Sequence, residues 1–271
     1  MARLVRIDVE LVRRGLARSR GEAAELISEG RVSVDGVAVT KVARQVSRDQ
    51  SLRLAADDGP RYASRGAHKL AGALDLLGDA APTVGGRRVL DAGASTGGFT
   101  DVLLRRGAAH VVAVDVGYGQ LAWHLRQDDR VTVLDRTNVR YLDPADVAPP
   151  PDLVVADLSF ISLTLVLPAL AAAAAPEADF LVMVKPQFEV GREALGSGGV
   201  VRDPADHARA IRKVAEAAHE LGLHTRAVVA SPLPGPRGNI EYFLALGRAA
   251  EAIDVDEAIR GAIADRPGSH R

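Results

Sequence analysis

A glycine-rich turn between a short apolar strand and a helix start limits the fold of this chain more than any other feature. The stretch 87–100, RRVLDAGASTGGFT, predicts a strand, a turn with three glycines and the first turn of a helix. Glycine lets a backbone pass close to a ligand, and the start of a helix offers unpaired N–H groups. The pattern therefore predicts an α/β sheet that binds a nucleotide or nucleoside. Dinucleotide-binding oxidoreductases share this turn, so the turn alone does not identify the chemistry.

Polar residues follow the ends of the predicted strands. Asp91 and Asp115 end the first two strands, Asn138 follows the third, and Asp157 and Lys185 follow the fourth and fifth. In open α/β sheets ligands bind outside the carboxyl ends of the strands, so we expect these side chains at one rim. Asp115 is placed to bind the ribose hydroxyls of NAD or S-adenosylmethionine equally well. The strands after the first are expected at 110–115, 131–134, 152–156 and 180–184.

The last part of the domain favours a methyltransferase. A helix at 204–221 precedes a strand at 225–230, a loop at 231–238 and a strand at 239–246. In methyltransferases such a hairpin closes the sheet, with its last strand inserted antiparallel. A plain NAD-binding domain would instead continue in parallel. We therefore predict a class I, Rossmann-like methyltransferase fold with a seven-stranded sheet.

The amino-terminal residues predict a separate small α+β unit. Helical spacing of apolar residues between Ile7 and Leu16 indicates a first helix, and Ser19 with Glu22 forms a capping-box pattern for a second. Alternating residues around Asp35-Gly36 predict a hairpin. Residues 1–65 hold 13 Lys and Arg against 9 Asp and Glu, a balance of +4, which leaves −5 for the rest. Two interpretations of this imbalance stay open: the basic first part holds a polyanion, or the balance of +4 is ordinary scatter.

Composition bounds the remaining possibilities. The chain has 271 residues, of which 47% are hydrophobic, so it can form one large α/β core and a small second domain. It has no cysteine, which excludes disulfides and thiolate chemistry. We find no secretory leader, no stretch long enough to span a membrane and no metal-ligand spacing of histidines. The expected protein is soluble and cytoplasmic, with no metal and no membrane partner.

Two resemblances add to this interpretation. The segment GLARSRGEAAELISEGRVSVDG resembles the S4 RNA-binding domain. Nearly the whole chain resembles the TlyA family of ribosomal RNA 2′-O-methyltransferases, historically labelled haemolysin A, in six motifs: SRGAHKL, LDAGASTGGFTDVLL, VDVGYGQLAWHLR, VVADLSFISL, VKPQFEVG and SPLPGPRGNIEYFL. We expect an S4-like RNA-binding domain at 1–60, a linker at 61–66 and a methyltransferase domain at 67–271.

The TlyA resemblance implies an activity and a site. It implies S-adenosylmethionine as the cofactor and a cytidine ribose in ribosomal RNA within ribosomal subunits as the substrate, in 23S and also in 16S RNA. We infer no obligate protein partner. The resemblance assigns a catalytic Lys-Asp-Lys-Glu tetrad to Lys69, Asp157, Lys185 and Glu241. Cofactor contacts are expected at Asp91, Gly93, Ala94, Ser95, Thr96, Gly97, Gly98, Phe99, Asp115, Asn138 and Asp157. RNA contacts are expected at Arg6, Arg18, Arg20, Lys41 and Arg65.

The tetrad suits chemistry on a hydroxyl. A ribose 2′-hydroxyl is a weak nucleophile, and a lysine can accept its proton only when burial or a nearby cation disfavours the ammonium form. Lys185 is the candidate base, with Lys69 as the nearby cation, Asp157 holding Lys185 and Glu241 holding Lys69. In the alternative, Lys185 stays protonated and steers the hydroxyl.

Three other functions compete with this one. A methyltransferase acting on a base or a protein is disfavoured because Asp157-Leu158-Ser159-Phe160 lacks the amide and prolines of amino-group chemistry. A pore-forming haemolysin is disfavoured because the alanine-rich stretch 163–175 is too short to span a membrane. The third is an RNA-binding protein without catalysis. Trp123 and Phe99 are expected to pack in the core rather than to stack on a base.

Overall fold

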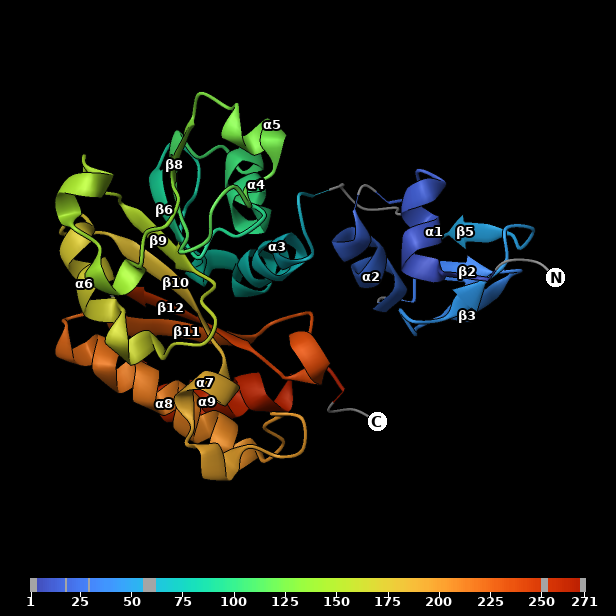
Figure 1. Cartoon of the computed structure of the whole chain (residues 1–271). Helices are drawn as coiled ribbons and strands as arrows, with labels where there is room; N and C mark the ends of the chain where they lie inside the picture. The colour runs from blue at the N-terminus through green and yellow to red at the C-terminus, as the bar shows by residue number, and fades with distance from the viewer. Residues whose placement is uncertain (1–3, 18, 29, 56–61, 250–252, 269–271) are drawn as a thin grey trace. The chain divides into compact units, whose positions relative to one another are not determined.

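The chain folds into two compact units, Met1–Arg61 and Tyr62–Arg271. The structure is a computed structural model that describes residues 4–17, 19–28, 30–55, 62–249 and 253–268 (Figure 1).

The first unit consists of two helices and short strands around one apolar core. Its helices are α1 (Ile7–Arg13) and α2 (Arg20–Ser28), and its strands are β1 (Val5–Arg6), β2 (Val32–Val34), β3 (Val37–Val39), β4 (Gln45–Val46) and β5 (Leu52–Leu54). The strands form a three-stranded sheet in the order β3-β2-β5 and a β1-β4 pair. The Ser19 hydroxyl accepts the Glu22 N–H at 3.2 Å, as the capping-box pattern predicts. Asp35 and Gly36 turn the β2-β3 hairpin with φ of 51° and 84°.

The second unit is built on a seven-stranded mixed sheet in the order β11-β12-β10-β9-β6-β7-β8. Its strands are β6 (Arg88–Ala92), β7 (His110–Val114), β8 (Val131–Leu134), β9 (Leu153–Ala156), β10 (Asp179–Val184), β11 (His224–Ala230) and β12 (Tyr242–Gly247). The first five are parallel, and β12 is antiparallel to both β10 and β11. This topology confirms the predicted fold class.

Helices cover both faces of this sheet (Figure 1). On one face α3 (Gly66–Leu77), α4 (Gly98–Arg105) and α5 (Trp123–Arg126) share an apolar cluster with alternate strand residues such as Val89. On the other face α6 (Leu167–Ala173), α8 (Pro204–Glu220) and α9 (Val255–Ala264) pack around residues such as Leu90. Neighbouring residues of β6 thus point to opposite cores, as expected for a strand buried on both faces.

The glycine-rich turn is tight because the protein itself crowds it. Gly93 has a φ of 89°, and a Cβ there would lie 2.5 Å from the Asp157 carbonyl oxygen. A Cβ on Gly98 would lie 2.3 Å from the Ser64 hydroxyl and 2.8 Å from the Ala67 nitrogen. Close approach of these neighbouring segments therefore requires glycine at both positions, whatever ligand the turn holds.

The alanine-rich stretch 163–175 contains a 3₁₀ turn (Leu163–Leu165) and the seven-residue α6. Within the described ranges, no helix has the length and apolar character needed to cross a bilayer.

Candidate active site

Two ion pairs contain all four residues of the predicted tetrad, one of them buried and the other, at Asp157, partly buried. Lys69, on α3, donates from Nζ to Glu241 Oε2 at 2.6 Å. The Lys69 side chain is 9% exposed and that of Glu241 is 0% exposed. Lys185 Nζ lies 2.5 Å from Asp157 Oδ1, and the Lys185 side chain is 8% exposed.

The sheet register brings the two pairs to one place. Asp157 directly follows β9 and Lys185 directly follows β10, and these strands are parallel neighbours. Glu241 directly precedes β12, which pairs with β10 so that Val184 is opposite Tyr242. Lys185 and Glu241 are therefore the next residues beyond the same antiparallel pair. The predicted strand at 239–246 begins at Tyr242 instead, so Glu241 lies at the strand entry.

Helix α3 brings Lys69 to the strand ends that carry the other three residues of the tetrad. A Cβ on Gly66, the first residue of α3, would lie 3.8 Å from Asp157 Oδ2. Lys69 is one helical turn further along. The tetrad thus converges from four separate segments of the chain: α3, the end of β9, the end of β10 and the start of β12.

Ser159 is a member of this site that the sequence analysis did not single out. Lys185 Nζ donates to the Ser159 hydroxyl at 3.1 Å, in addition to its ion pair with Asp157. Ser159 lies in the DLSF turn, where Phe160 has a φ of 64°. A serine three residues after the end of a strand carries no distinctive spacing, and its contact with Lys185 is visible only in the structure.

Asp91 lies beneath the glycine-rich turn. Its Oδ2 accepts the Thr100 hydroxyl at 2.6 Å, and its Oδ1 has no hydrogen-bond partner in the part of the chain that the structure describes. Complete burial, supported by the negative charge of Asp157, raises the pKa of the Asp91 carboxyl to about 7, although the Thr100 hydrogen bond opposes the shift.

Asp115 is bound to the backbone of two loops. Its Oδ2 accepts the Ser95 N–H at 2.8 Å, and its Oδ1 accepts the Gly117 N–H at 2.7 Å. These bonds fix the glycine-rich turn to the loop after β7. Asn138 is exposed, and its side chain caps the 3₁₀ turn Val139–Tyr141 by accepting the Arg140 N–H. Asp115 directly follows β7, and Asn138 lies four residues beyond Leu134, the last residue of β8.

The residues of the glycine-rich turn differ in how exposed they are. Ser95 and Thr96 are exposed, and Phe99 is buried, with its ring stacked 6.1 Å from that of Phe243. Gly93 is half-buried, and the others are buried: Ala94, Gly97 and Gly98. A ligand at this rim would therefore meet Ser95 and Thr96 first.

Trp123 is exposed, so its predicted place in the core is wrong. Its exposed fraction is 73%, because α5 is a single turn in which Leu125 faces the core. Tyr118 and Tyr141 are 69% and 74% exposed, and the Arg136 guanidinium lies 4.3 Å from the Tyr118 ring centroid. Phe99 occupies the core as predicted.

The first unit carries arginines held by two buried carboxylates. Asp8 accepts hydrogen bonds from Arg6 at 3.0 Å and from Arg20 at 2.9 Å. Glu10 binds Arg13 and Arg14 at 2.6 and 2.8 Å. The arginine hydrogen bonds lower the pKa of each carboxyl to about 2, against the effect of burial. The Arg6 and Arg20 side chains stay 44% and 62% exposed, and the predicted contact Arg18 lies outside the described residues.

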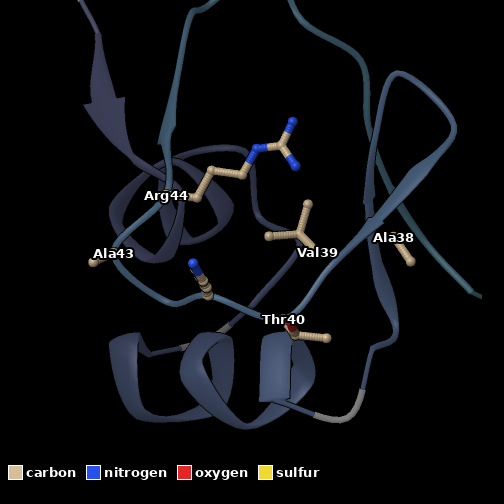
Figure 2. A pocket seen from close by; sticks show the side chains of 6 residues that line it. Ala38, Val39, Thr40, Ala43 and Arg44 are labelled. Atoms are coloured by element: carbon tan, nitrogen blue, oxygen red, sulfur yellow. The ribbon is translucent and has the colours of Figure 1, made fainter.

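The other two predicted RNA contacts, Lys41 and Arg65, belong to different units of the chain. Lys41 is exposed and lines a hollow of about 390 Å³ in the first unit, together with Ala38, Val39, Thr40, Ala43 and Arg44 (Figure 2). The hollow contains no member of the tetrad. Arg65 belongs to the second unit and donates to the Pro234 carbonyl at 3.2 Å.

The residues before α3 are attached to the second unit. The Ala63 N–H donates to Asp101 at 2.8 Å, and the Arg105 guanidinium lies 4.6 Å from the Tyr62 ring centroid.

Among the described residues, no group of three or more His, Asp and Glu side chains could hold a metal ion.

Two known protein families match the chain, one in each of its two units. The FtsJ-like methyltransferase family matches residues 62–248, and the S4 domain family matches residues 5–52. A Mycobacterium tuberculosis (strain H37Rv) protein, the 16S/23S rRNA (cytidine-2′-O)-methyltransferase TlyA, is 58% identical over 271 residues, covering 98% of this chain and 100% of the relative. The 23S rRNA (cytidine-2′-O)-methyltransferase TlyA of Campylobacter jejuni is 30% identical, covering 83% of this chain and 92% of the relative.

A solved structure has the same fold over nearly the full length. It is described as "Putative hemolysin from Streptococcus thermophilus", is 37% identical, and superposes with a TM-score of 0.76 over 97% of this chain and 96% of its own.

Proposed function

Since the chain belongs to the TlyA family and contains an FtsJ-like methyltransferase domain and an S4 domain, we propose that it methylates the ribose 2′-hydroxyl of cytidine in ribosomal RNA, with S-adenosylmethionine as methyl donor. The substrates that we propose are 23S and 16S RNA, as in the M. tuberculosis relative's name. The expected location is the cytoplasm, where ribosomal subunits are assembled.

One observation carries the proposal: two buried lysines form ion pairs with two carboxylates at the edge of the sheet where the parallel strands β9 and β10 end. Methyl transfer to a hydroxyl requires a group that orients the oxygen and accepts or relays its proton. We assign that role to Lys185, whose Nζ already contacts Asp157 and Ser159. Held by a carboxylate and a hydroxyl, Lys185 is arranged as a hydrogen-bond donor, which supports steering of the nucleophile over direct deprotonation.

Lys69 and Glu241 have a supporting part in this proposal. Their 2.6 Å bond fixes α3 against the residue that adjoins Lys185 in the sheet register. The pair leaves Lys69 with a carboxylate partner of its own, so the charge that it presents to Lys185 is partly neutralised. This pairing weakens the idea that Lys69 activates Lys185 by repulsion.

The rim residues fit S-adenosylmethionine. The cofactor carries a cationic sulfonium and an ammonium group, and Asp91 offers a buried oxygen without a partner among the described residues. We propose that Asp91, Asp115, Asn138 and the turn 93–99 hold the cofactor, with Ser95 and Thr96 as the exposed edge. When bound, the cofactor supplies a methyl group already activated by positive charge.

The first unit is the proposed RNA-binding module, in residues 1–60, and the methyltransferase domain is proposed at 67–271. Arg6 and Arg20 present guanidinium groups that are exposed yet fixed by Asp8, which suits phosphate contacts. Lys41 would extend this surface, and the neighbouring Arg18 is proposed on the sequence alone.

Mass mapping of ribosomal RNA tests the activity. RNA from a strain lacking the gene should gain 2′-O-methylcytidine in both subunits when the wild-type chain is supplied, and should gain none with Lys185→Ala. Cofactor titration should show that Lys185→Ala still binds S-adenosylmethionine. Methylated RNA from the Lys185→Ala strain would remove Lys185 from the mechanism, and unmethylated RNA from the complemented strain would refute the proposed function.

A further inference from the structure

The loops that carry Asp157 and Lys185 are joined by Glu189, a buried acid outside the tetrad. Glu189 ends the short helix α7 (Pro186–Glu189), which begins directly after Lys185. Its side chain is 1% exposed. A carboxylate this deeply buried needs several partners, since desolvation of an unpaired charge is costly.

Glu189 finds its partners in the loop that follows Asp157. Its Oε1 accepts the Leu163 N–H at 2.7 Å, and its Oε2 accepts the Ser162 hydroxyl at 2.5 Å. The Ser162 hydroxyl also accepts the Thr164 N–H at 3.3 Å, so the same contacts cap the 3₁₀ turn Leu163–Leu165. The helix after Lys185 is therefore tied to Ser162 and Leu163, three and four residues beyond Ser159.

Two more contacts reinforce the connection. The rings of Phe160 and Phe188 lie 5.3 Å apart between the same two segments. Lys213, on α8, donates to the Glu189 carbonyl oxygen at 2.9 Å, and its Nζ lies 3.5 Å from the carboxylate. Glu189 is thus the point at which the loop after β9, the helix after β10 and α8 meet.

From these contacts we propose that Glu189 is a positioning residue, which holds the loop after β9 against α7 and so fixes Asp157 and Ser159 around Lys185 Nζ. Without these contacts, the position of each segment would be fixed only by the strand that it follows. A displacement of about 1 Å between reacting groups is enough to lower a rate by orders of magnitude. The proposal rests on the proposed methyl transfer by this site.

The test compares Glu189→Ala with a control that loses a different helix cap. Asp254 caps α9 by accepting the Glu257 N–H at 2.9 Å, so Asp254→Ala also removes a carboxylate cap, but in another part of the unit. We expect Glu189→Ala to lower kcat for rRNA methylation at least tenfold, with the KM for S-adenosylmethionine within twofold of wild type. Asp254→Ala should keep kcat within twofold.

Further variants separate positioning from loss of folding. Glu189→Gln keeps an acceptor for the Leu163 N–H and should retain an intermediate kcat, even if the alanine variant does not fold. Ser162→Ala removes one arm of the connection, so its effect on kcat should not add to that of Glu189→Gln. Equal kcat for the Glu189 variants and the Asp254→Ala control, or full additivity with Ser162→Ala, would overturn the proposal.

A readout that needs no turnover tests the geometry directly. Acylation of lysines, followed by mass spectrometry, should label Lys185 several-fold faster in Glu189→Gln than in wild type or Asp254→Ala, with exposed Lys41 as the internal reference. Unchanged labelling of Lys185 would count against the proposal. If the wild-type chain methylates no rRNA but the labelling differs as expected, the proposed function falls and the positioning role of Glu189 stands.

Discussion

Asp91 shows how much of this site depends on the surroundings of a single residue. The sequence identified it as the acid at the end of the first strand of the sheet, which is a matter of pattern. Its complete burial, its bond to Thr100 and its unpartnered oxygen depend on how α4 packs behind the turn. The raised pKa of about 7 follows from that packing and could not be predicted from the sequence.

The Asp91 shift predicts a pH dependence of stability. The folded chain binds a proton at Asp91 up to a pH of about 7, whereas an unfolded aspartate loses its proton near a pH of about 4. Stability should therefore fall as pH rises from about 4 to about 7 and level off above. Asp91→Asn should remove this decline, so its stability relative to wild type should rise by about 2 to 4 kcal/mol between pH 5 and pH 8.

Urea unfolding of the two proteins at pH 5 and pH 8 measures this effect. Asp75→Asn is the control, because the Asp75 side chain is 70% exposed. A stability difference between wild type and Asp91→Asn that is the same at both pH values would contradict a raised pKa.

Ser159 gives a second prediction at this scale. Ser159→Ala removes one of the two groups that contact Lys185 Nζ but leaves the ion pair with Asp157. We expect kcat to fall about three- to tenfold, in line with about 1 kcal/mol for one hydrogen bond, while the cofactor Kd is unchanged. Steady-state kinetics on rRNA would show it, and an unaltered kcat would mean that Ser159 does not contribute to orienting Lys185.

The elements were more predictable than the contacts between them. Apolar runs with polar residues at their ends predicted every strand of the large sheet, and the antiparallel insertion of β12 followed from the terminal hairpin. Trp123 shows where prediction failed: a tryptophan in a short helix was expected inside, but a four-residue helix has one inward position and Leu125 fills it. Such choices depend on tertiary packing, which sequence periodicity does not contain.

Helix α1 gives a prediction about the RNA surface. Asp8 does not itself present a donor to phosphate, yet it fixes Arg6 and Arg20. In the full chain, Asp8→Asn should lower the affinity for rRNA several-fold, almost as much as Arg20→Ala does. The affinity for the cofactor should not change. Filter binding of both variants measures this, with Asp49→Asn on the exposed surface as a control. RNA affinity equal to wild type in Asp8→Asn would show that the arginines need no fixation.

The turn at Gly93 gives a prediction for the large unit. Gly93→Ala would place a methyl group 2.5 Å from the Asp157 carbonyl oxygen at a φ of 89°. Both the clash and the backbone strain should destabilise the unit by about 2 kcal/mol or more, because neither can be relieved without moving the end of β9. Thermal unfolding would detect the change, and Gly85→Ala serves as the control, because a Cβ there would lie no closer than 3.7 Å to its nearest neighbour. Equal melting temperatures for the two variants would contradict this account of the turn.

At the scale of the whole molecule, two units divide the work that we propose. The first holds Arg6 and Arg20 at the surface, with Arg20 62% exposed, and the second holds Lys69 and Lys185 inside, with Lys185 8% exposed. The resemblance to the TlyA family predicted the chemistry, and the roles of the four tetrad residues stay a prediction, while no residue pattern within either unit identifies the nucleotide.

Because these charges differ in burial, ionic strength should affect RNA binding and the tetrad differently. Mobile ions screen exposed charges over about 8 Å at physiological salt but hardly reach buried pairs, and release of counterions makes phosphate contacts steeply salt-dependent. Added potassium chloride should therefore strip RNA from the arginines while leaving the Lys69–Glu241 and Lys185–Asp157 pairs formed. A high-salt wash during purification should yield protein that is free of nucleic acid and still takes up its cofactor.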